Sequence, residues 1–590
     1  MLTCKGLGMN RNAVANREEG PMRDETFDIV VVGGGHNGST IAAYLAKSGL
    51  SVAVCEARPE CGGGQENTEP RPGFRIDPHA TYLYGGAAPG FDQLELWKYG
   101  MRMVYYPSMS GVVTLDGVAA NMGSRWRPDI LEESARRFFP EQGGGGGLVD
   151  ALPEPAMREL LRSLFWTPPH PRQHEIDEAD LPWWQVFRKH VPELWTERLL
   201  DMSYCDFLEE FVPWEPARVL GAMGAWYCGA HPNWDGMMLP SLGGTMLFGY
   251  SGGSPRGGMH TYAHAIIRCA IAHGARILTN SPVEEIIVRN GRAVGVQLSA
   301  DASFPEKTIW ARKAVISGAD VKQTFLHLVG PQHMDAGFAQ RVADVSLKGG
   351  SLFVMSVICR ELPKYHGRED AFPEDIYPSC VVGPADSMDF FYAQTRDAYS
   401  HKKVPASLTP EHLTMMICSH DQYDPTRTVD GYHVLSPIYL ECPPPQYDVD
   451  GPEGYNRRKQ EIVDAALALI ERMAPNMHAD NIVDVFVNTP YDSEFRNAGM
   501  SGGNWYGARQ SADQWFGTRP IPELARYRTP IDGLYLCSQS MHPGGLCLMA
   551  VPYNLMHILI EDGIVEPASW WYPSEWYVPE SGRPMAGVAR

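Results

Sequence analysis

The sequence predicts an α/β protein in which a parallel, nucleotide-binding sheet is interrupted by a second domain of α+β type. The first observation is the order of elements from 27 to 56: a β-branched run, a glycine-rich turn, an alanine-rich helical segment and a second apolar run. The second is that strand-like apolar runs of the same kind return at 310–317 and 532–538, after long segments that lack this rhythm. The chain therefore leaves the first sheet and comes back to it, as expected for a Rossmann-like domain with an insertion.

The glycine-rich turn has the pattern Gly-x-Gly-x-x-Gly, and an acidic residue closes the apolar run that follows the helical segment. In this pattern Gly33 permits a tight turn, Gly35 lets the backbone approach a pyrophosphate, and Gly38 lets the helix lie close to the strand. Glu56 follows at the distance expected for a residue that accepts hydrogen bonds from ribose hydroxyls. The alternative is a glycine-rich turn in some other α/β protein. The position of the turn between a strand and a helix favours a dinucleotide site.

Composition limits the class of protein and its partners. The chain has 590 residues and a formal net charge of −20, which argues against a nucleic-acid partner. Its 12 cysteines form no Cys-x-x-Cys pair and no zinc-like spacing, so we expect a reducing compartment and no metal site. We expect residues 1–26 to be a disordered leader, because they lack the apolar core of a secretory signal. No apolar run reaches spanning length, so we expect a cytoplasmic protein, with peripheral membrane association as an alternative.

Glycines recur soon after the predicted ribose acid. Gly62, Gly63 and Gly64 are followed by Gln65, an arrangement that suits backbone passing close to a larger, extended cofactor; a flexible surface loop is the alternative. From 97 to 240 the chain is rich in Trp, Phe, Met and Pro, with helix-like stretches at 130–139, 156–165 and 205–211. The tract 143–147 reads as a flexible loop, since no strand precedes it.

Later segments return to the sheet and extend the second domain. A helix is expected at 262–273, strands at 275–278, 283–288, 293–298 and 310–317, and a turn at Asn290-Gly291. Strands at 354–358, 413–419 and 433–439 and a helix at 457–473 suit a wall of a substrate cavity. A strand at 532–538, the double glycine Gly544-Gly545 and a helix at 550–560 supply a second helix N-terminus near the cofactor. The aromatic tail from 566 to 590 is expected to dock on its own body or on a second copy of the chain.

Four separated blocks together resemble the phytoene-desaturase-like FAD-dependent oxidoreductases, a branch of the flavin amine oxidase superfamily. The blocks are 33–56 with Gly62-Gly63, 257–320, 489–514 and 533–545, and they span nearly the whole chain. The resemblance implies non-covalently bound FAD. It also implies an FAD-binding domain formed by 27–96, 241–330 and 490–565, and a substrate domain formed by 97–240 and 331–489. The cofactor-binding residues that we expect are Gly33, Gly35, His36, Asn37, Gly38, Glu56, Ala57, Gly62, Gly63, Gly64, Gln65, Val283, Gly318, Ser538, Gly544 and Gly545.

Three positions depart from the family pattern. Gly64 stands where amine oxidases usually carry Arg, Leu546 where a third glycine is common, and Tyr553-Asn554 where Arg-Asn is frequent. These departures leave FAD binding in place but make a typical carotenoid an unexpected substrate.

The function expected from the resemblance is dehydrogenation, or desaturation, of a mainly apolar small molecule by hydride transfer to flavin N5. Oxygen, a quinone or a soluble carrier then accepts the electrons, since the chain has one dinucleotide fingerprint. His79, Tyr82, Tyr506 and His542 are the candidate catalytic residues, for proton removal or relay. The alternatives are a flavin-dependent double-bond isomerase, an amine oxidase and a non-catalytic flavin-binding scaffold. A homo-oligomer is a further expectation that the sequence leaves open.

Overall fold

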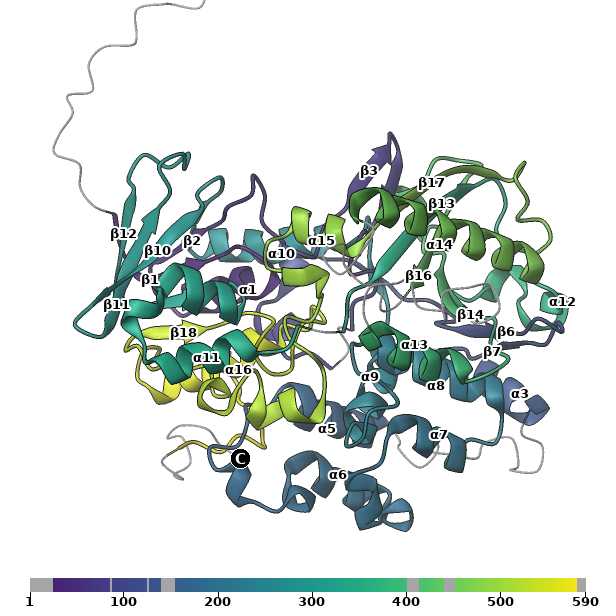
Figure 1. Ribbon diagram of the computed structural model, residues 1–590, viewed down its shortest axis with the longest axis horizontal. Coiled ribbons are helices and arrows are strands. Elements are labelled where there is room, and N and C mark those ends of the chain that lie inside the picture. Colours follow the sequence, from purple (N-terminus) through teal and green to yellow (C-terminus); the bar gives the residue numbers. More distant parts are fainter. Residues whose placement is uncertain are drawn as a thin grey trace, which may run out of the picture.

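The computed structural model describes residues 25–84, 87–124, 127–138, 154–347, 349–400, 413–439 and 451–580. The predicted leader and the glycine tract 143–147 lie outside the described residues. Figure 1 shows two lobes side by side, each built on a sheet, with a layer of helices below them. The first lobe contains the nucleotide-binding sheet and the second contains the sheet of the α+β domain.

The first sheet is assembled from segments that are far apart in the sequence. Its strands follow the order β10-β11-β12-β1-β2-β9, and β18 pairs with the end of β12. β1 runs parallel to both β2 and β12, and β12 runs parallel to β18, so the returns to the sheet predicted at 310–317 and 532–538 are present. The strands are β1 (Glu25–Val32), β2 (Val52–Cys55), β9 (Arg276–Leu278), β10 (Val283–Arg289), β11 (Arg292–Leu298), β12 (Thr308–Ser317) and β18 (Leu534–Leu536).

Three buried helices pack beside this sheet. α1 (His36–Lys47) connects β1 to β2, and it packs against α10 (Met259–Ala272) and α16 (Ala550–Glu561). Its alanines and Gly38 are almost inaccessible to solvent, which explains why small residues dominate its sequence. The hairpin turn between β10 and β11 has φ values of 51° at Asn290 and 77° at Gly291, as an Asn-Gly turn of this type requires.

The second sheet follows the order β17-β13-β16-β15-β14-β6-β7 and is antiparallel except where β14 pairs with β6. The strand β13, which lies between β17 and β16, is buried at every residue. The long helix α14 (Gly451–Met473) lies in the same lobe (Figure 1). The strands are β6 (Gly111–Val113), β7 (Ala119–Asn121), β13 (Phe353–Cys359), β14 (Cys380–Gly383), β15 (Met415–Cys418), β16 (His433–Tyr439) and β17 (Ile482–Asn488). These strands all come from the segments expected to form the substrate domain; the exact domain boundaries stay a prediction.

Among the helices of this layer that the sequence did not predict are α8 (Glu215–Tyr227) and α9 (Met238–Ser251). They pack on each other and on α5 and α7, and most of their residues are buried. A helix that is apolar on all sides has no period to detect, and the glycines and proline of α9 disguise it further. The layer also holds α3 (Pro128–Phe138), α5 (Glu154–Phe165), α6 (Pro182–His190) and α7 (Tyr204–Phe211); α11 (Ala336–Asp344), α13 (Asp389–Ser400) and α15 (Pro490–Arg496) lie elsewhere. Among the described helices, none is long and apolar enough to cross a membrane.

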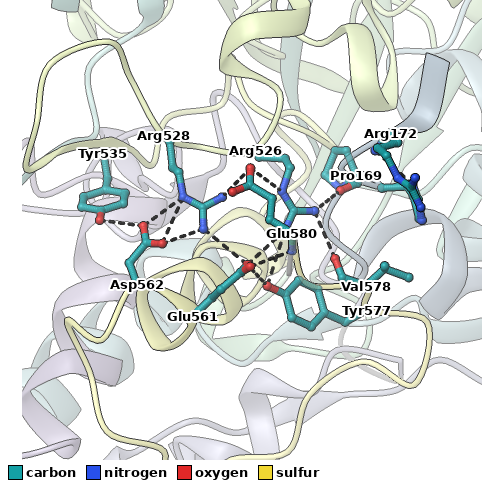
Figure 2. Close-up of polar contacts among 11 residues, drawn as sticks. Pro169, Arg172, Arg526, Arg528, Tyr535, Glu561, Asp562, Tyr577, Val578 and Glu580 are labelled. Carbon is teal, nitrogen blue, oxygen red and sulfur yellow. Dashed lines mark hydrogen bonds and ion pairs between the residues drawn. The ribbon is translucent and has the colours of Figure 1, made fainter. Parts of the chain in front are cut away.

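The described part of the aromatic tail, 566–580, docks on its own chain. Arg526 donates to the carbonyl of Val578 and pairs with Glu561 at 3.2 Å, and the Tyr577 hydroxyl donates to the same carboxylate (Figure 2). Glu580 pairs with Arg528 at 3.1 Å. Further up the tail, Trp570 stacks on Tyr44 of α1 with ring centroids 6.0 Å apart. The tail thereby fastens α16 to α1.

Candidate cofactor and substrate cavity

One elongated cavity runs from the glycine-rich turn to a group of aromatic side chains between the two lobes. Its empty volume is about 1680 Å³, open solvent at the mouth included. Twelve of the expected cofactor-binding residues line it: Gly33, Gly35, His36, Asn37, Gly38, Glu56, Ala57, Gly63, Gly64, Val283, Gly318 and Gly545. We call the end near Glu56 and Val283 the nucleotide end and the end near Tyr82 and Trp505 the inner end.

The glycine-rich turn is shaped for close approach. Gly33 has a φ of 86°, in the region that favours glycine, and Gly35 caps α1 with ordinary φ. The first helical hydrogen bond runs from Ser39 N to Gly35 O at 2.8 Å, so the three N–H groups before it have no acceptor within the helix. These N–H groups belong to His36, Asn37 and Gly38, which all line the cavity. They form a site for an anionic group such as a diphosphate.

Glu56 ties the end of β2 to this turn. One carboxylate oxygen accepts from Gly34 N at 2.6 Å and the other from Arg58 N at 2.8 Å. The side chain still lines the cavity, and each carboxylate oxygen has a second lone pair for a ligand hydroxyl. The expected ribose contact is therefore compatible with the geometry, and Glu56 also fixes the shape of the turn.

His36 is held neutral beside the N-terminus of α1. Burial lowers its pKa to about 3, although the hydrogen bond with Gln65 opposes that shift. Met549 N donates to its Nε2 at 3.0 Å, and the Gln65 side-chain Nε2 lies 2.7 Å from its Nδ1. Gln65 does not line the cavity; it orients His36 instead. The positive potential here therefore comes from the helix N-terminus and not from an imidazolium.

The inner end is mainly aromatic, and His79 is its one acidic or basic side chain among the described residues. Tyr82, Tyr84, Tyr227, Trp505 and Tyr506 line it with His79 and Ala80. The charged side chains that line the described cavity are Glu56 and Arg58, and both belong to the nucleotide end. The inner end therefore suits an apolar and electrically neutral molecule.

His79 lies at the inner end, but both of its ring nitrogens face protein groups. Nδ1 lies 3.3 Å from the Glu66 carboxylate, and Nε2 lies 3.1 Å from the Ser493 hydroxyl. Glu66 is almost fully buried; burial raises its pKa, but His79 and Arg58 outweigh that effect and lower it to about 2. Glu66 thus stays ionised and orients the imidazole. His79 therefore forms part of the cavity wall, and neither of its ring nitrogens is free to contact a ligand.

The hydroxyls of Tyr82 and Tyr506 also point to protein partners. Tyr82 Oη lies 3.1 Å from Ser379 Oγ, which itself donates to Met109 O. Tyr506 donates to Tyr227 O at 2.7 Å. A backbone carbonyl cannot pass on a proton, so neither hydroxyl begins a proton relay. Both residues line the cavity as expected, but as walls.

Four further candidates lie outside the cavity lining. Gly62 N donates to Gly34 O at 2.9 Å and so braces the turn from behind, and Ser538 Oγ accepts from Ser540 N. Gly544 packs against buried Arg519, whose guanidinium donates to the carbonyls of Tyr506 and Gln539. His542, a candidate catalytic residue, is fully buried in the core and its Nε2 donates to Leu164 O at 2.9 Å. Burial and nearby Arg519 hold its pKa well below the usual value, so the structure gives this histidine a packing role.

Sequence reasoning missed several residues of the inner end and the mouth. Tyr84 and Tyr227 lie in segments with no motif, and the loop 497–500 reaches the cavity only because α15 places it there. Leu546 also lines the cavity, and its φ of 113° is one that side chains rarely adopt. A leucine where relatives commonly have glycine was the one available signal.

The cavity fits an extended dinucleotide cofactor. The N–H groups at the start of α1 face the cavity, and the Glu56 carboxylate lies at the expected ribose position. Gly35 and Gly63 face each other closely, because an added Cβ on Gly63 would lie 3.1 Å from Gly35. Beyond the diphosphate position there is still room for a large ring system in front of the aromatic wall. The residues therefore fit FAD better than a mononucleotide.

Comparison with known proteins agrees with this geometry. A family model of the NAD(P)-binding Rossmann-like domain matches residues 31–94. Pyridine nucleotide-disulfide oxidoreductase domain-containing protein 2 of Rattus norvegicus is 26% identical over 580 residues, covering 91% of this chain and 94% of that protein. A limonene dehydrogenase polypeptide of Castellaniella defragrans is 23% identical over 559 residues, covering 92% and 96%. Hydroxyneurosporene desaturase of Cereibacter sphaeroides is 23% identical over 545 residues, covering 90% and 96%.

Among solved structures, cyclohexylamine oxidase from Brevibacterium oxydans matches with a TM-score of 0.53 at 16% identity, covering 92% of this chain and 99% of that one. At this identity the match shows the fold alone. The predicted fold class and the predicted resemblance are both confirmed by these comparisons.

Proposed function

We propose that this chain is an FAD-dependent oxidoreductase of the carotenoid desaturase and amine oxidase superfamily, and that it dehydrogenates a mainly apolar small molecule. The observation that carries the proposal is the inner end of the cavity, which is aromatic and, apart from His79, lacks an acidic or basic side chain among the described residues. When bound, FAD supplies the acceptor for a hydride at its N5 atom. The protein supplies position, a dry environment and electrostatics.

The chain's own residues divide this work between the two ends. The N–H groups at the start of α1 hold the diphosphate, and Glu56 holds the ribose. Tyr506 and Trp505 form a wall whose position is fixed by Asn504, since the Asn504 side chain accepts from Tyr506 N at 2.7 Å. The aromatic walls exclude water and orient the reacting C–H bond.

An amine substrate is less well supported. A protonated amine needs a carboxylate or an array of acceptors when it leaves water, because burying an unpaired charge is costly. The Glu66 carboxylate is close to the inner end, but it is occupied by Arg58 at 2.7 Å and by His79. Hydrophobic burial is the interaction that this end offers.

The candidate bases also favour hydride transfer without a strong protein base. Each expected catalytic side chain that lines the cavity has its polar atoms directed to protein partners. Removal of a hydride from an apolar C–H bond depends first on alignment. The hydrogen on the neighbouring carbon leaves as a proton, which solvent at the open mouth of the cavity accepts. Oxygen, a quinone or a soluble carrier completes the cycle as electron acceptor.

The test is the visible spectrum of the purified protein, alone and then under anaerobic conditions with terpenoid, alicyclic and amine compounds. We expect flavin bands that bleach with an apolar compound and not with amines. A colourless protein that takes up no added FAD would contradict the assignment of the cofactor to this cavity. Bands that bleach with amines alone would move the assignment to an amine oxidase. A product with the same mass as its substrate, formed only after flavin reduction, would identify an isomerase.

A further inference from the structure

Four tyrosines line the inner end, and three of them use their hydroxyls within the protein. Tyr82 pairs with Ser379, Tyr506 donates to the carbonyl of Tyr227, and Tyr227 Oη lies 2.7 Å from Thr81 Oγ1. These contacts satisfy the polar atoms, so the three rings present only their faces and edges to a ligand.

Tyr84 differs from the other three. Its side chain is buried, with 2% of the residue exposed, and its Oη makes no hydrogen bond with the described residues. The Cys228 thiol lies nearby, but its own proton is directed to Gly244 O at 3.3 Å, and a thiol sulfur is a weak acceptor. Burial holds the pKa of Tyr84 well above its usual value, so the hydroxyl keeps its proton and acts as a donor.

A buried donor without a partner costs about 1–3 kcal/mol, and proteins generally retain such a group only where a ligand or a water completes it. Tyr84 lines the cavity, so a molecule bound at the inner end lies within its reach. The space behind this end is filled by packed aromatic rings. Tyr82 contacts Phe248, Tyr106 and His420 with centroids 5.3, 6.2 and 4.4 Å apart. Among the described residues, these rings close the cavity behind Tyr82, so a long linear molecule does not extend past that ring.

We propose that the substrate is a compact, mainly apolar molecule with one oxygen function, a carbonyl or a hydroxyl, which accepts a hydrogen bond from Tyr84. This inference rests on the proposed function, because it concerns the same inner end. It adds a specificity-determining residue and narrows the substrate class from apolar compounds in general to those with a single hydrogen-bond acceptor. The hydrogen bond fixes which carbon of a nearly featureless skeleton faces the cofactor.

The experiment compares two probes that share a carbon skeleton, carvone and limonene, of which carvone alone carries a carbonyl. Binding to the oxidised, FAD-loaded enzyme is measured as the perturbation of the flavin visible spectrum, without turnover. In the wild-type enzyme we expect carvone to bind about 5- to 150-fold more tightly than limonene, the ratio equivalent to the cost of an unmade hydrogen bond. Tyr84→Phe should abolish that ratio by weakening carvone while limonene binding stays unchanged.

Tyr82→Phe is the matched control, because its hydroxyl is already paired with Ser379 and its loss should leave the ratio intact. A ratio near one in the wild-type enzyme, a ratio unchanged in Tyr84→Phe, or binding of neither probe would overturn the inference. A Tyr84→Phe spectrum that changes without any probe, at an unchanged ratio, would assign the hydroxyl to the cofactor and also overturn it. Failure of the proposed function would give a different result: the protein would show no flavin bands, or no compound would bleach them.

Discussion

Gly38→Ala tests how closely α1 must lie against β1 for the cofactor site to exist. A Cβ at this position would overlap the carbonyl oxygen of Gly33 and lie 3.1 Å from its carbon. Ordinary carbon contacts lie at about 3.5–4.0 Å, so the helix start has to move away from the turn. Overpacking of this kind costs about 1–3 kcal/mol, and the same movement misdirects the N–H groups of His36 and Asn37. We expect lower stability of the apo protein and a loss of FAD.

Two other glycines make the test specific. Gly35→Ala keeps an ordinary φ and places its Cβ 3.8 Å from Gly63. It should therefore leave the apo protein as stable as wild type but weaken the binding of FAD. Gly249→Ala, in α9, meets nothing within 4 Å and should stabilise the protein by about 0.5–1 kcal/mol without changing FAD binding. The assays are the flavin-to-protein absorbance ratio after gel filtration and the thermal midpoint with and without FAD. A Gly38→Ala protein with full FAD and a wild-type midpoint would refute the reasoning.

Three further predictions concern acid stability, the backbone near the cavity and the tail. The pKa of Glu66 is lowered in the folded state to about 2 from an ordinary value of 4.5, so its contribution of roughly 3 kcal/mol is present above pH 4.5 and lost as the pH falls towards 2. The thermal midpoint of Glu66→Gln should accordingly fall less steeply than that of wild type over that range, and parallel curves would contradict the assignment. Leu546→Gly and Leu546→Ala remove nearly the same side chain, but alanine keeps the unfavourable φ of 113°, so the glycine variant should be more stable by about 1 kcal/mol in chemical unfolding; equal stabilities would exclude backbone strain there. Deletion of 566–590 removes the contacts of Trp570 with Tyr44 and of Tyr577 with Glu561, so FAD should dissociate faster in a fluorescence-release assay, with Tyr577→Phe as a milder variant; an unchanged rate would show that the tail does not support α1.

The nucleotide-binding part of the fold was predictable because its signals are local. Gly33 to Glu56 contains a turn, a helix and a strand in consecutive residues directly after β1, and each has its own periodicity or turn chemistry. The strands that return at β12 and β18 were visible as short apolar runs for the same reason. In contrast, α8 and α9 were missed, because helices buried on all sides carry no amphipathic pattern.

The candidate site could be predicted only in part, because hydrogen-bond direction is a tertiary property. Sequence reasoning placed His79, Tyr82 and Tyr506 near the cofactor, and all three line the cavity. It had no means to see that their polar atoms turn to Ser493, Ser379 and Tyr227, residues that are far away in the sequence. It also assigned His542 from its neighbouring glycines, whereas the packing around Leu164 and Arg519 places that ring in the core.

The two ends of the cavity are therefore encoded differently. Binding of the diphosphate depends on backbone N–H groups and on the absence of side chains, and a short run of glycines is enough to specify both. The inner end depends on Tyr84, Tyr227 and Trp505, which come from separate segments and meet only after both lobes have folded. The experiments that decide the substrate therefore concern the inner end of the cavity.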